Sequence, residues 1–88
     1  MIAQEFIITN RLGIHARPAA LIAKMANRFK SSIKVQKDGL EVNGKSIMGI
    51  MMLAAAKGNR ITVLAEGIDE KEAMECLGEI IHKKFGED

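Results

Sequence analysis

The sequence predicts one α+β domain, built as an open-faced sandwich in which helices cover one side of a single sheet. Segments of alternating apolar and polar residues, typical of half-buried strands, are interspersed with segments whose apolar residues recur at three- and four-residue spacing, typical of amphipathic helices. Each strand has one apolar face, so one side of the sheet can carry the helices. With 88 residues, the chain is long enough for one domain, 1–88, and not for two.

The chain begins with a strand and continues with a helix. A strand is expected over residues 4–9, with Phe6 and Ile8 facing inward and Ile7 on the outer face. A Gly-containing turn then leads into a helix expected over residues 16–29. Its apolar stripe comprises Ala19, Ile22, Ala23, Ala26 and Phe29. Pro18 fits this helix only in the first turn, where its missing N–H costs nothing, and this fixes the helix start close to His15.

A hairpin follows the first helix. Ile33 and Val35 alternate with polar residues in a second strand, and Leu40 and Val42 continue the alternation in a third strand. Asp38-Gly39 lies between them and is typical of a two-residue hairpin turn, because both residues tolerate positive φ.

The last part of the chain adds two helices and a strand. A short helix is expected over residues 47–55 and a fourth strand over residues 60–66. Asp69 followed by Glu72 resembles a capping box at the start of a final helix that runs to about residue 84.

Composition excludes several classes of function. The formal net charge is only +2, and the basic residues are scattered among nearly as many carboxylates, so nucleic acid is not an expected partner. The three aromatic residues offer little platform for stacked bases. Cys76 is the only cysteine, and we identify neither a signal peptide nor a stretch that could span a bilayer. We therefore expect a cytoplasmic protein without membrane insertion.

The chemistry of the sequence is concentrated between Gly13 and Pro18. Gly13 permits an unusual turn, His15 is expected at or beside the helix N-cap, and Arg17 is expected in the first turn. A helix start has unpaired N–H groups and the positive end of the dipole, which attract an anion. A neutral imidazole is a nucleophile near pH 7, and a guanidinium can bind two phosphoryl oxygens.

This arrangement favours phosphoryl transfer through His15. An ordinary surface or capping histidine beside a solvated arginine is the alternative interpretation of the same residues. No metal-ligand partner lies near His15 in the sequence, so no metal site is expected.

The segment GIHARPAA resembles the active-site motif of the HPr family, the histidine-containing phosphocarriers of the bacterial phosphoenolpyruvate-dependent phosphotransferase system. The resemblance implies that enzyme I passes a phosphoryl group to Nδ1 of His15, which donates it to an enzyme IIA-type domain for sugar uptake. Arg17 would assist the transfer, and the backbone of Ala16 and Arg17 would bind the phosphoryl group. The resemblance also implies a four-stranded antiparallel sheet in the order 1-4-2-3, with three helices on one face.

Further expectations follow from the same resemblance. Such a protein is a phosphoryl carrier with no turnover of its own, and we expect it to use no cofactor and to be a monomer. Leu12, Ile47, Met48 and Met51 match an exposed apolar patch that packs against partners in this family. Methionine suits a surface that must fit several partners, because its side chain is flexible and polarizable.

Ser46 is expected to be the N-cap of the short helix. The segment GKSIMGIMMLAAAKG, which contains it, resembles the regulatory-serine segment of the HPr family, where a serine kinase/phosphorylase modifies the serine. A phosphate there would add negative charge to the partner-facing surface and disfavour docking to enzyme I. A helix cap without regulation is the simpler interpretation. A second function is a regulatory interaction module, switched by Ser46 phosphorylation, that binds a partner such as a transcription regulator.

The branch of the family stays open. Residues 10–13 (NRLG) and the ending at residues 85–88 (FGED) resemble a nitrogen-related branch, whereas residues 44–49 (GKSIMG) resemble sugar-system members with a kinase site. The sequence therefore leaves two alternatives for the acceptor that receives the phosphoryl group from His15.

Overall fold

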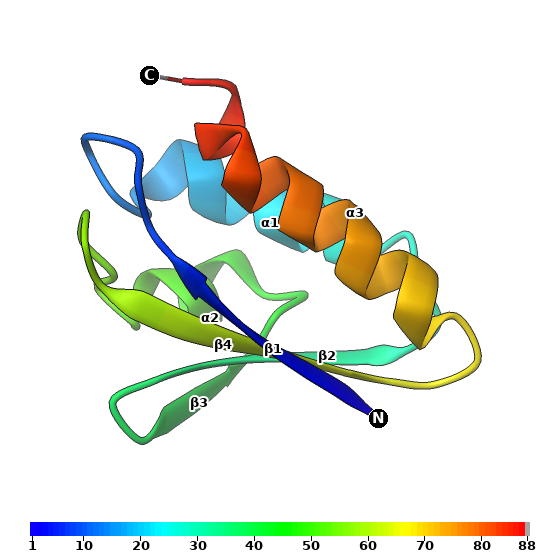
Figure 1. Ribbon diagram of the computed structural model, residues 1–88. Helices are drawn as coiled ribbons and strands as arrows, with labels where there is room; N and C mark the ends of the chain where they lie inside the picture. The colour runs from blue at the N-terminus through cyan, green and yellow to red at the C-terminus, as the bar shows by residue number, and fades with distance from the viewer. Residues whose placement is uncertain (88) are drawn as a thin grey trace.

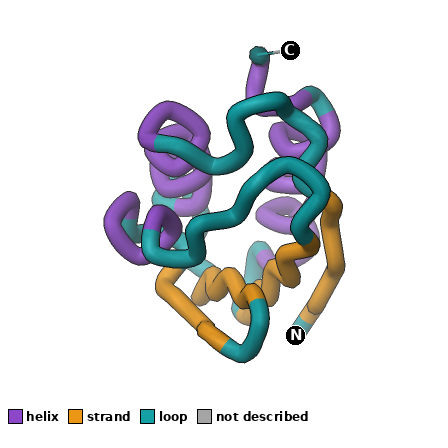
Figure 2. The backbone as a smooth tube through the Cα atoms, turned by 90° about the vertical axis from the view of Figure 1, so that its left-hand side faces the viewer, coloured by secondary structure: helices purple, strands orange, loops and turns teal. Residues whose placement is uncertain are grey.

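The computed structural model describes residues 1–87 and shows an antiparallel four-stranded sheet in the order β1-β4-β2-β3. The strands are β1 (Ile2–Ile7), β2 (Ser32–Lys37), β3 (Leu40–Asn43) and β4 (Arg60–Glu66), and the helices are α1 (Ala16–Ala26), α2 (Ile47–Met51), α3 (Glu70–His82) and the 3-10 helix η1 (Lys84–Gly86). The helices α1, α2 and α3 cover one face of the sheet (Figures 1 and 2). The predicted fold class and strand order are confirmed. Asp88, the last residue of the acidic ending, lies outside the described residues.

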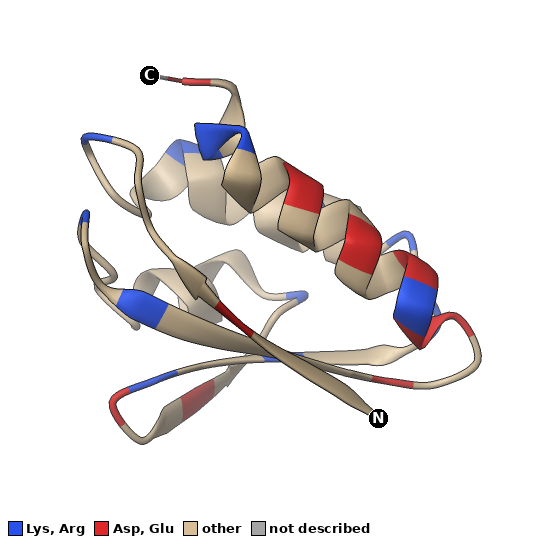
Figure 3. Ribbon diagram, in the orientation of Figure 1, with Lys and Arg blue, Asp and Glu red and all other residues tan. Residues whose placement is uncertain are grey.

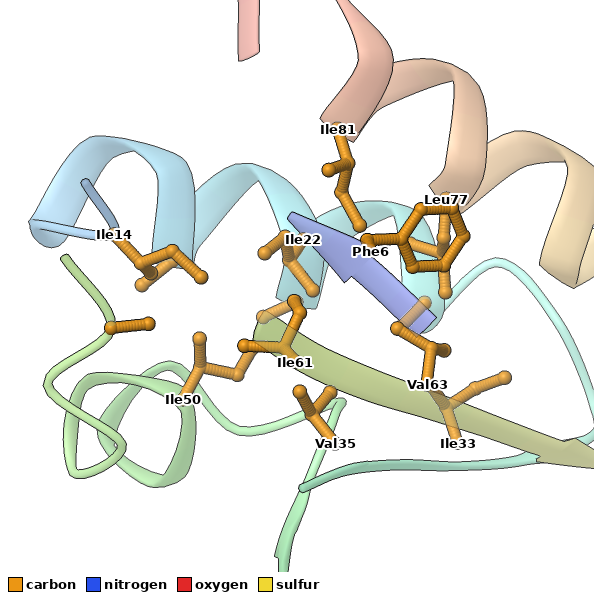
Figure 4. Packing of buried hydrophobic residues seen from close by; sticks show 14 of the residues in the cluster. Phe6, Ile14, Ile22, Ile33, Val35, Ile50, Ile61, Val63, Leu77 and Ile81 are labelled. Atoms are coloured by element: carbon orange, nitrogen blue, oxygen red, sulfur yellow. The ribbon is translucent and has the colours of Figure 1, made fainter. Parts of the chain in front are cut away.

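The sheet register gathers the apolar side chains on its inner face. Phe6 pairs with Ile61, Val35 with Val63, and Ile33 with Ala65, and all six side chains are buried. The helices add the buried residues Ala19, Ile22, Ala23, Ala26, Ile50, Ala73, Met74, Leu77 and Ile81. These side chains meet the sheet in one core (Figure 4), which stabilises the fold by removing apolar surface from water.

The hairpin between β2 and β3 forms at the predicted turn. Asp38 and Gly39 have φ of 50° and 84°, the positive values that a two-residue hairpin turn requires.

The first strand lies two residues earlier than predicted. It covers Ile2–Ile7 rather than residues 4–9, because its pairing with β4 runs from Ile2 opposite Ala65 to Ile7 opposite Arg60. Ile7 is on the outer face as expected, and Ile8 is fully buried although it lies beyond the strand. The N–H of Ile8 donates to the carbonyl oxygen of Asn59 at 2.9 Å, which fixes the chain as it leaves the sheet.

The first helix ends at Ala26, short of the predicted end at Phe29. The amide of Asn27 donates to the carbonyl oxygens of Ala23 at 2.7 Å and of Lys45 at 3.0 Å. The side chain therefore satisfies a last-turn carbonyl and ties the end of α1 to the segment before α2. Phe29 still packs, partly buried, against the core.

The second helix ends at Met51, although the prediction extended it to residue 55. The chain turns at Ala54, whose φ is +49°, and Leu53 and Ala55 are buried beside this turn. The carbonyl oxygen of Ala55 accepts a hydrogen bond from the N–H of Ile14 at 2.8 Å. Residues 53–55 therefore support the loop before α1 instead of extending the helix.

The predicted capping box of Asp69 and Glu72 is wrong. Asp69 does occupy the N-cap of α3, but its carboxylate accepts hydrogen bonds from the N–H groups of Lys30 and Ser31, both at 2.9 Å, and from the Ser31 hydroxyl. Glu70 instead binds the backbone just before α3, because its carboxylate accepts a hydrogen bond from the N–H of Gly67 at 3.0 Å.

The last helix stops at His82 rather than near residue 84. Lys84 and Phe85 have φ of 56° and 57°, and the short η1 that follows buries the Phe85 ring. This turn directs the end of the chain back toward the start of α1 (Figure 1).

Candidate functional site

The loop before α1 is held tightly at Gly13 and Ile14. Gly13 has a φ of +68°, and a Cβ atom there would lie only 2.6 Å from the carbonyl oxygen of Ala55, so this position requires glycine. Ile14 donates its N–H to the same oxygen and buries its side chain in the core. In Figure 2 this loop and the loop after α2 cross the same face of the molecule. Both contacts fix the point from which His15 leaves the loop.

His15 is the N-cap of α1, as predicted. Its backbone is extended, with φ −91° and ψ −167°, and its carbonyl oxygen accepts from the N–H of Ala19 at 3.0 Å. Ala16 and Arg17 are the first two helical residues, so helix geometry gives their N–H groups no acceptor within α1. Both are exposed, while Pro18 is buried in the first turn, where it needs no hydrogen-bond partner. The start of α1 thus carries a half-exposed imidazole at its N-cap and an exposed arginine in its first turn.

Glu87 completes the site from the other end of the chain. The two oxygens of its carboxylate lie 3.0 and 3.2 Å from Nε2 of His15, and Oε1 also accepts a hydrogen bond from Nδ2 of Asn10 at 2.9 Å. The hydrogen bonds from His15 and Asn10, helped by the charge of Arg17, hold the pKa of the Glu87 carboxyl below its usual value. A charged carboxylate therefore faces the Nε2 side of the ring. None of the hydrogen bonds described within residues 1–87 engages Nδ1.

Glu87 and Asn10 were not predicted from the sequence to be site residues. Glu87 lies 72 residues from His15, and nothing in local periodicity connects the two. Asn10 has 0% of its surface exposed, and its amide also donates to the carbonyl oxygen of Gly13 at 2.7 Å. A polar residue just before a glycine turn, and an aromatic residue beyond the last helix, were the only sequence signals for this cluster.

The predicted apolar patch is exposed. Leu12, Ile47, Met48 and Met51 all present large apolar side chains to solvent, with Met48 71% exposed. Met52 belongs to the same exposed set and was not predicted, whereas Ile50 and Leu53 are core residues. Because α2 packs against α1 and its following loop supports Gly13, this patch borders the start of α1.

Ser46 is the N-cap of α2, as predicted. Its hydroxyl oxygen accepts a hydrogen bond from the N–H of Gly49 at 3.0 Å. The side chain is only partly buried and directly precedes Ile47 and Met48 of the apolar patch.

Charges are distributed unevenly over the molecule. In Figure 3, Lys and Arg mark the end of the molecule where α1 begins, while Asp and Glu form bands along α3. Within residues 1–87, no group of three or more His, Cys, Asp or Glu side chains is arranged to hold a metal ion. No helix in this described part is long and apolar enough to cross a membrane.

Comparisons with known proteins agree on one family. A family model described as "PTS HPr component phosphorylation site" matches residues 2–83. The phosphocarrier protein HPr of Neisseria meningitidis serogroup A is 49% identical over 87 residues, which is 99% of this chain and 98% of that protein. The crystal structure of HPr-C-His from Thermoanaerobacter tengcongensis matches with a TM-score of 0.96 and 49% identity, covering 100% of this chain and 99% of that one.

A further similar structure is that of Crh, a catabolite repression protein of Bacillus subtilis that forms a swapped, intertwined dimer. It matches with a TM-score of 0.76 and 44% identity, covering 96% of this chain and 97% of that chain.

Proposed function

Because this chain belongs to the HPr family of phosphotransferase-system phosphocarriers, we propose that it receives a phosphoryl group from enzyme I on Nδ1 of His15 and passes it to an enzyme IIA-type domain for sugar uptake. A member of this family is a phosphocarrier rather than a catalytic enzyme. The observation that carries the proposal is the position of His15, at a helix start beside Arg17 with Nδ1 free of the described hydrogen bonds.

Each group in the site has a role in this transfer. The Nδ1 lone pair of His15 attacks the phosphorus atom, while the N–H groups of Ala16 and Arg17 stabilise the phosphoryl oxygens at the start of α1. The guanidinium of Arg17 neutralises negative charge and can bind two oxygens at once. All three residues are at least partly exposed, so the phosphoryl group stays within reach of a second protein.

The apolar patch supplies the docking surface in this proposal. Leu12, Ile47, Met48 and Met51 would pack against both enzyme I and the IIA-type domain, because flexible methionines adapt to different partners. The basic residues near the start of α1 favour partners with an acidic surface (Figure 3). In this proposal the carrier is a cytoplasmic monomer.

Ser46 is the proposed regulatory site. A phosphate on its half-exposed hydroxyl would lie beside Ile47 and Met48 and would place negative charge on a surface that is proposed to meet acidic partners. The similarity to Crh favours a second candidate function, in which phosphorylation of Ser46 by the serine kinase/phosphorylase sets binding to a transcription regulator. The phosphocarrier function is preferred because His15 and Arg17 are both present at the start of α1.

Phosphoryl transfer from phosphoenolpyruvate through enzyme I tests the proposal. We expect acid-labile, alkali-stable phosphate on the protein, none on His15→Ala, and much slower transfer to Arg17→Ala. The matched control is His82→Ala, which removes the other, exposed histidine on α3 and is expected to accept phosphate normally. Labelling of His15→Ala at the normal rate would overturn the proposal. Presenting the phosphorylated protein to sugar-system and nitrogen-related IIA-type domains then identifies the branch.

A further inference from the structure

We propose that Glu87 is a positioning residue for His15, whose carboxylate keeps the ring proton on Nε2 so that Nδ1 retains its lone pair. The inference concerns the ring in the unphosphorylated protein, and its consequence for phosphoryl transfer rests on the function proposed above. It assigns a role to a residue that lies 72 positions from His15.

The contact between Glu87 and the ring selects one tautomer. A neutral imidazole has one N–H donor and one acceptor nitrogen, whereas a carboxylate only accepts. With Nε2 of His15 only 3.0 and 3.2 Å from the two carboxylate oxygens, a lone pair on Nε2 would face two acceptors. The tautomer with the proton on Nε2 instead makes a charge-assisted hydrogen bond. Nδ1 is then unprotonated.

Glu87 is itself held in place. Asn10 is fully buried and donates from Nδ2 both to Glu87 at 2.9 Å and to the carbonyl oxygen of Gly13 at 2.7 Å. Both neighbours are acceptors, so the amide nitrogen must face them. The Oδ1 atom of Asn10 is left buried without a hydrogen-bond partner among residues 1–87. Such an orphaned acceptor costs about 1–3 kcal/mol, and it shows that the donor contacts determine how the amide lies.

The segment that carries Glu87 is anchored by the core. Phe85 is 6% exposed and packs with the buried cluster, and the left-handed backbone of Lys84 and Phe85 ends α3 and turns the chain toward His15. The carboxylate also stays charged at neutral pH, since its hydrogen bonds from His15 and Asn10 lower its pKa.

This tautomer suits transfer in both directions. When Nδ1 attacks, a bond forms from Nδ1 to phosphorus, and the bond from phosphorus to the donor's leaving atom breaks with its electron pair going to the donor. No proton has to leave Nδ1. The phosphorylated ring carries a positive charge, which the adjacent Glu87 carboxylate offsets. When the acceptor attacks, the electron pair of the Nδ1–phosphorus bond returns to Nδ1, and the Nε2 proton stays in place throughout.

Nitrogen NMR of the His15 ring, at a pH where the ring is neutral, tests the assignment without enzyme I. We expect a protonated Nε2 and an unprotonated Nδ1 in the wild type. Glu87→Gln should keep this preference, because the amide oxygen still accepts, whereas Glu87→Ala should shift the ring toward a mixture of tautomers. The matched control is Glu75→Gln, which removes an exposed carboxylate of α3 and is expected to change nothing.

Rates of phosphorylation by enzyme I supply the second measurement. Glu87→Ala is expected to slow phosphorylation of His15, by about twofold if the two tautomers become equally populated, because only the ring with an unprotonated Nδ1 is competent. A wild-type ring protonated on Nδ1, or ring-nitrogen shifts unchanged in Glu87→Ala, would overturn the inference. A Glu87→Ala protein whose tautomer shifts while its rate of phosphorylation by enzyme I stays unchanged would also overturn it. The expected tautomer in a protein that enzyme I cannot phosphorylate would instead refute the proposed function and leave the role of Glu87 in the free protein intact.

Discussion

At the scale of single residues, Gly13 fixes the path of the chain into the reactive site. The sequence predicted a turn there, because glycine before a helix start permits unusual dihedral angles. The structure adds a second constraint, since any Cβ atom would lie 2.6 Å from the carbonyl oxygen of Ala55. That contact lies between segments far apart in the sequence, so local pattern alone did not predict it.

Gly13→Ala should therefore cost more than the left-handed backbone alone would explain. Gly39 provides the matched control, because its φ is +84° and nothing lies within 4 Å of its missing Cβ. We expect Gly39→Ala to lower the free energy of unfolding by about 1–2 kcal/mol. Gly13→Ala should lower it further, because the Ala55 backbone must also shift. Urea denaturation of both variants measures this difference, and equal losses would contradict the steric argument.

The residues of the site were predictable to different degrees. His15 and Arg17 were found because helix-start chemistry and the GIHARPAA motif are both local. Glu87 was missed because its contact with His15 depends on the left-handed turn at Phe85, which has no sequence signature comparable to a glycine. A hydrogen bond across 72 residues is a product of the tertiary fold.

At the scale of elements, the positions of helices and strands were predicted better than the residues at which they begin and end. The fourth strand was placed correctly at Arg60–Glu66, because strict alternation lies between two glycine-containing turns. The predicted end of α1 was wrong because the Asn27 side-chain amide donates to the carbonyl oxygens of both Ala23 and Lys45 and ends the helix at Ala26. The carbonyl of Lys45 lies in another segment, so helical periodicity carried no information about it.

The Asp69 carboxylate at the start of α3 binds Lys30 and Ser31, which precede β2. These hydrogen bonds should make the stability of the fold depend on pH in the acid range. The Ser31 hydroxyl, followed by the Lys30 N–H, lowers the pKa of Asp69 from its ordinary value of 3.8. Because the folded-state pKa is depressed, the charged carboxylate stabilises the fold at neutral pH. This contribution is lost as the pH falls below 3.8 and through the lowered folded-state value.

Asp69→Asn should accordingly be less stable than the wild type at pH 7, and the gap should narrow as the pH falls below 3.8. Urea denaturation across this range measures the gap. Asp38→Asn is the control, because Asp38 is an exposed turn residue and asparagine also tolerates its positive φ. A gap for Asp69→Asn that does not change with pH would show that the carboxylate charge does not contribute.

At the scale of the whole molecule, the site depends on packing that spans the entire chain. The strand order β1-β4-β2-β3 puts β1 at one edge of the sheet, and the loop that follows it leads to His15. The same core then binds Phe85 after the last helix, which brings Glu87 to the ring. The resemblance to the HPr family was enough to predict the topology. The contact of Glu87 with His15 depends on tertiary packing between the two ends of the chain.

Phe85→Ala should therefore weaken both the core and the site. Removing a buried aromatic ring costs about 3–5 kcal/mol, a large share of the 5–15 kcal/mol typical of a whole domain. Leu77→Ala is the matched control, because Leu77 is 1% exposed in the same core and its loss costs about 2–5 kcal/mol. We expect denaturation to show comparable destabilisation in the two variants. Nitrogen NMR under folded conditions should show a disturbed His15 tautomer only in Phe85→Ala, because only that variant releases the segment carrying Glu87. A folded Phe85→Ala protein with wild-type ring shifts would show that Glu87 reaches His15 without this anchor.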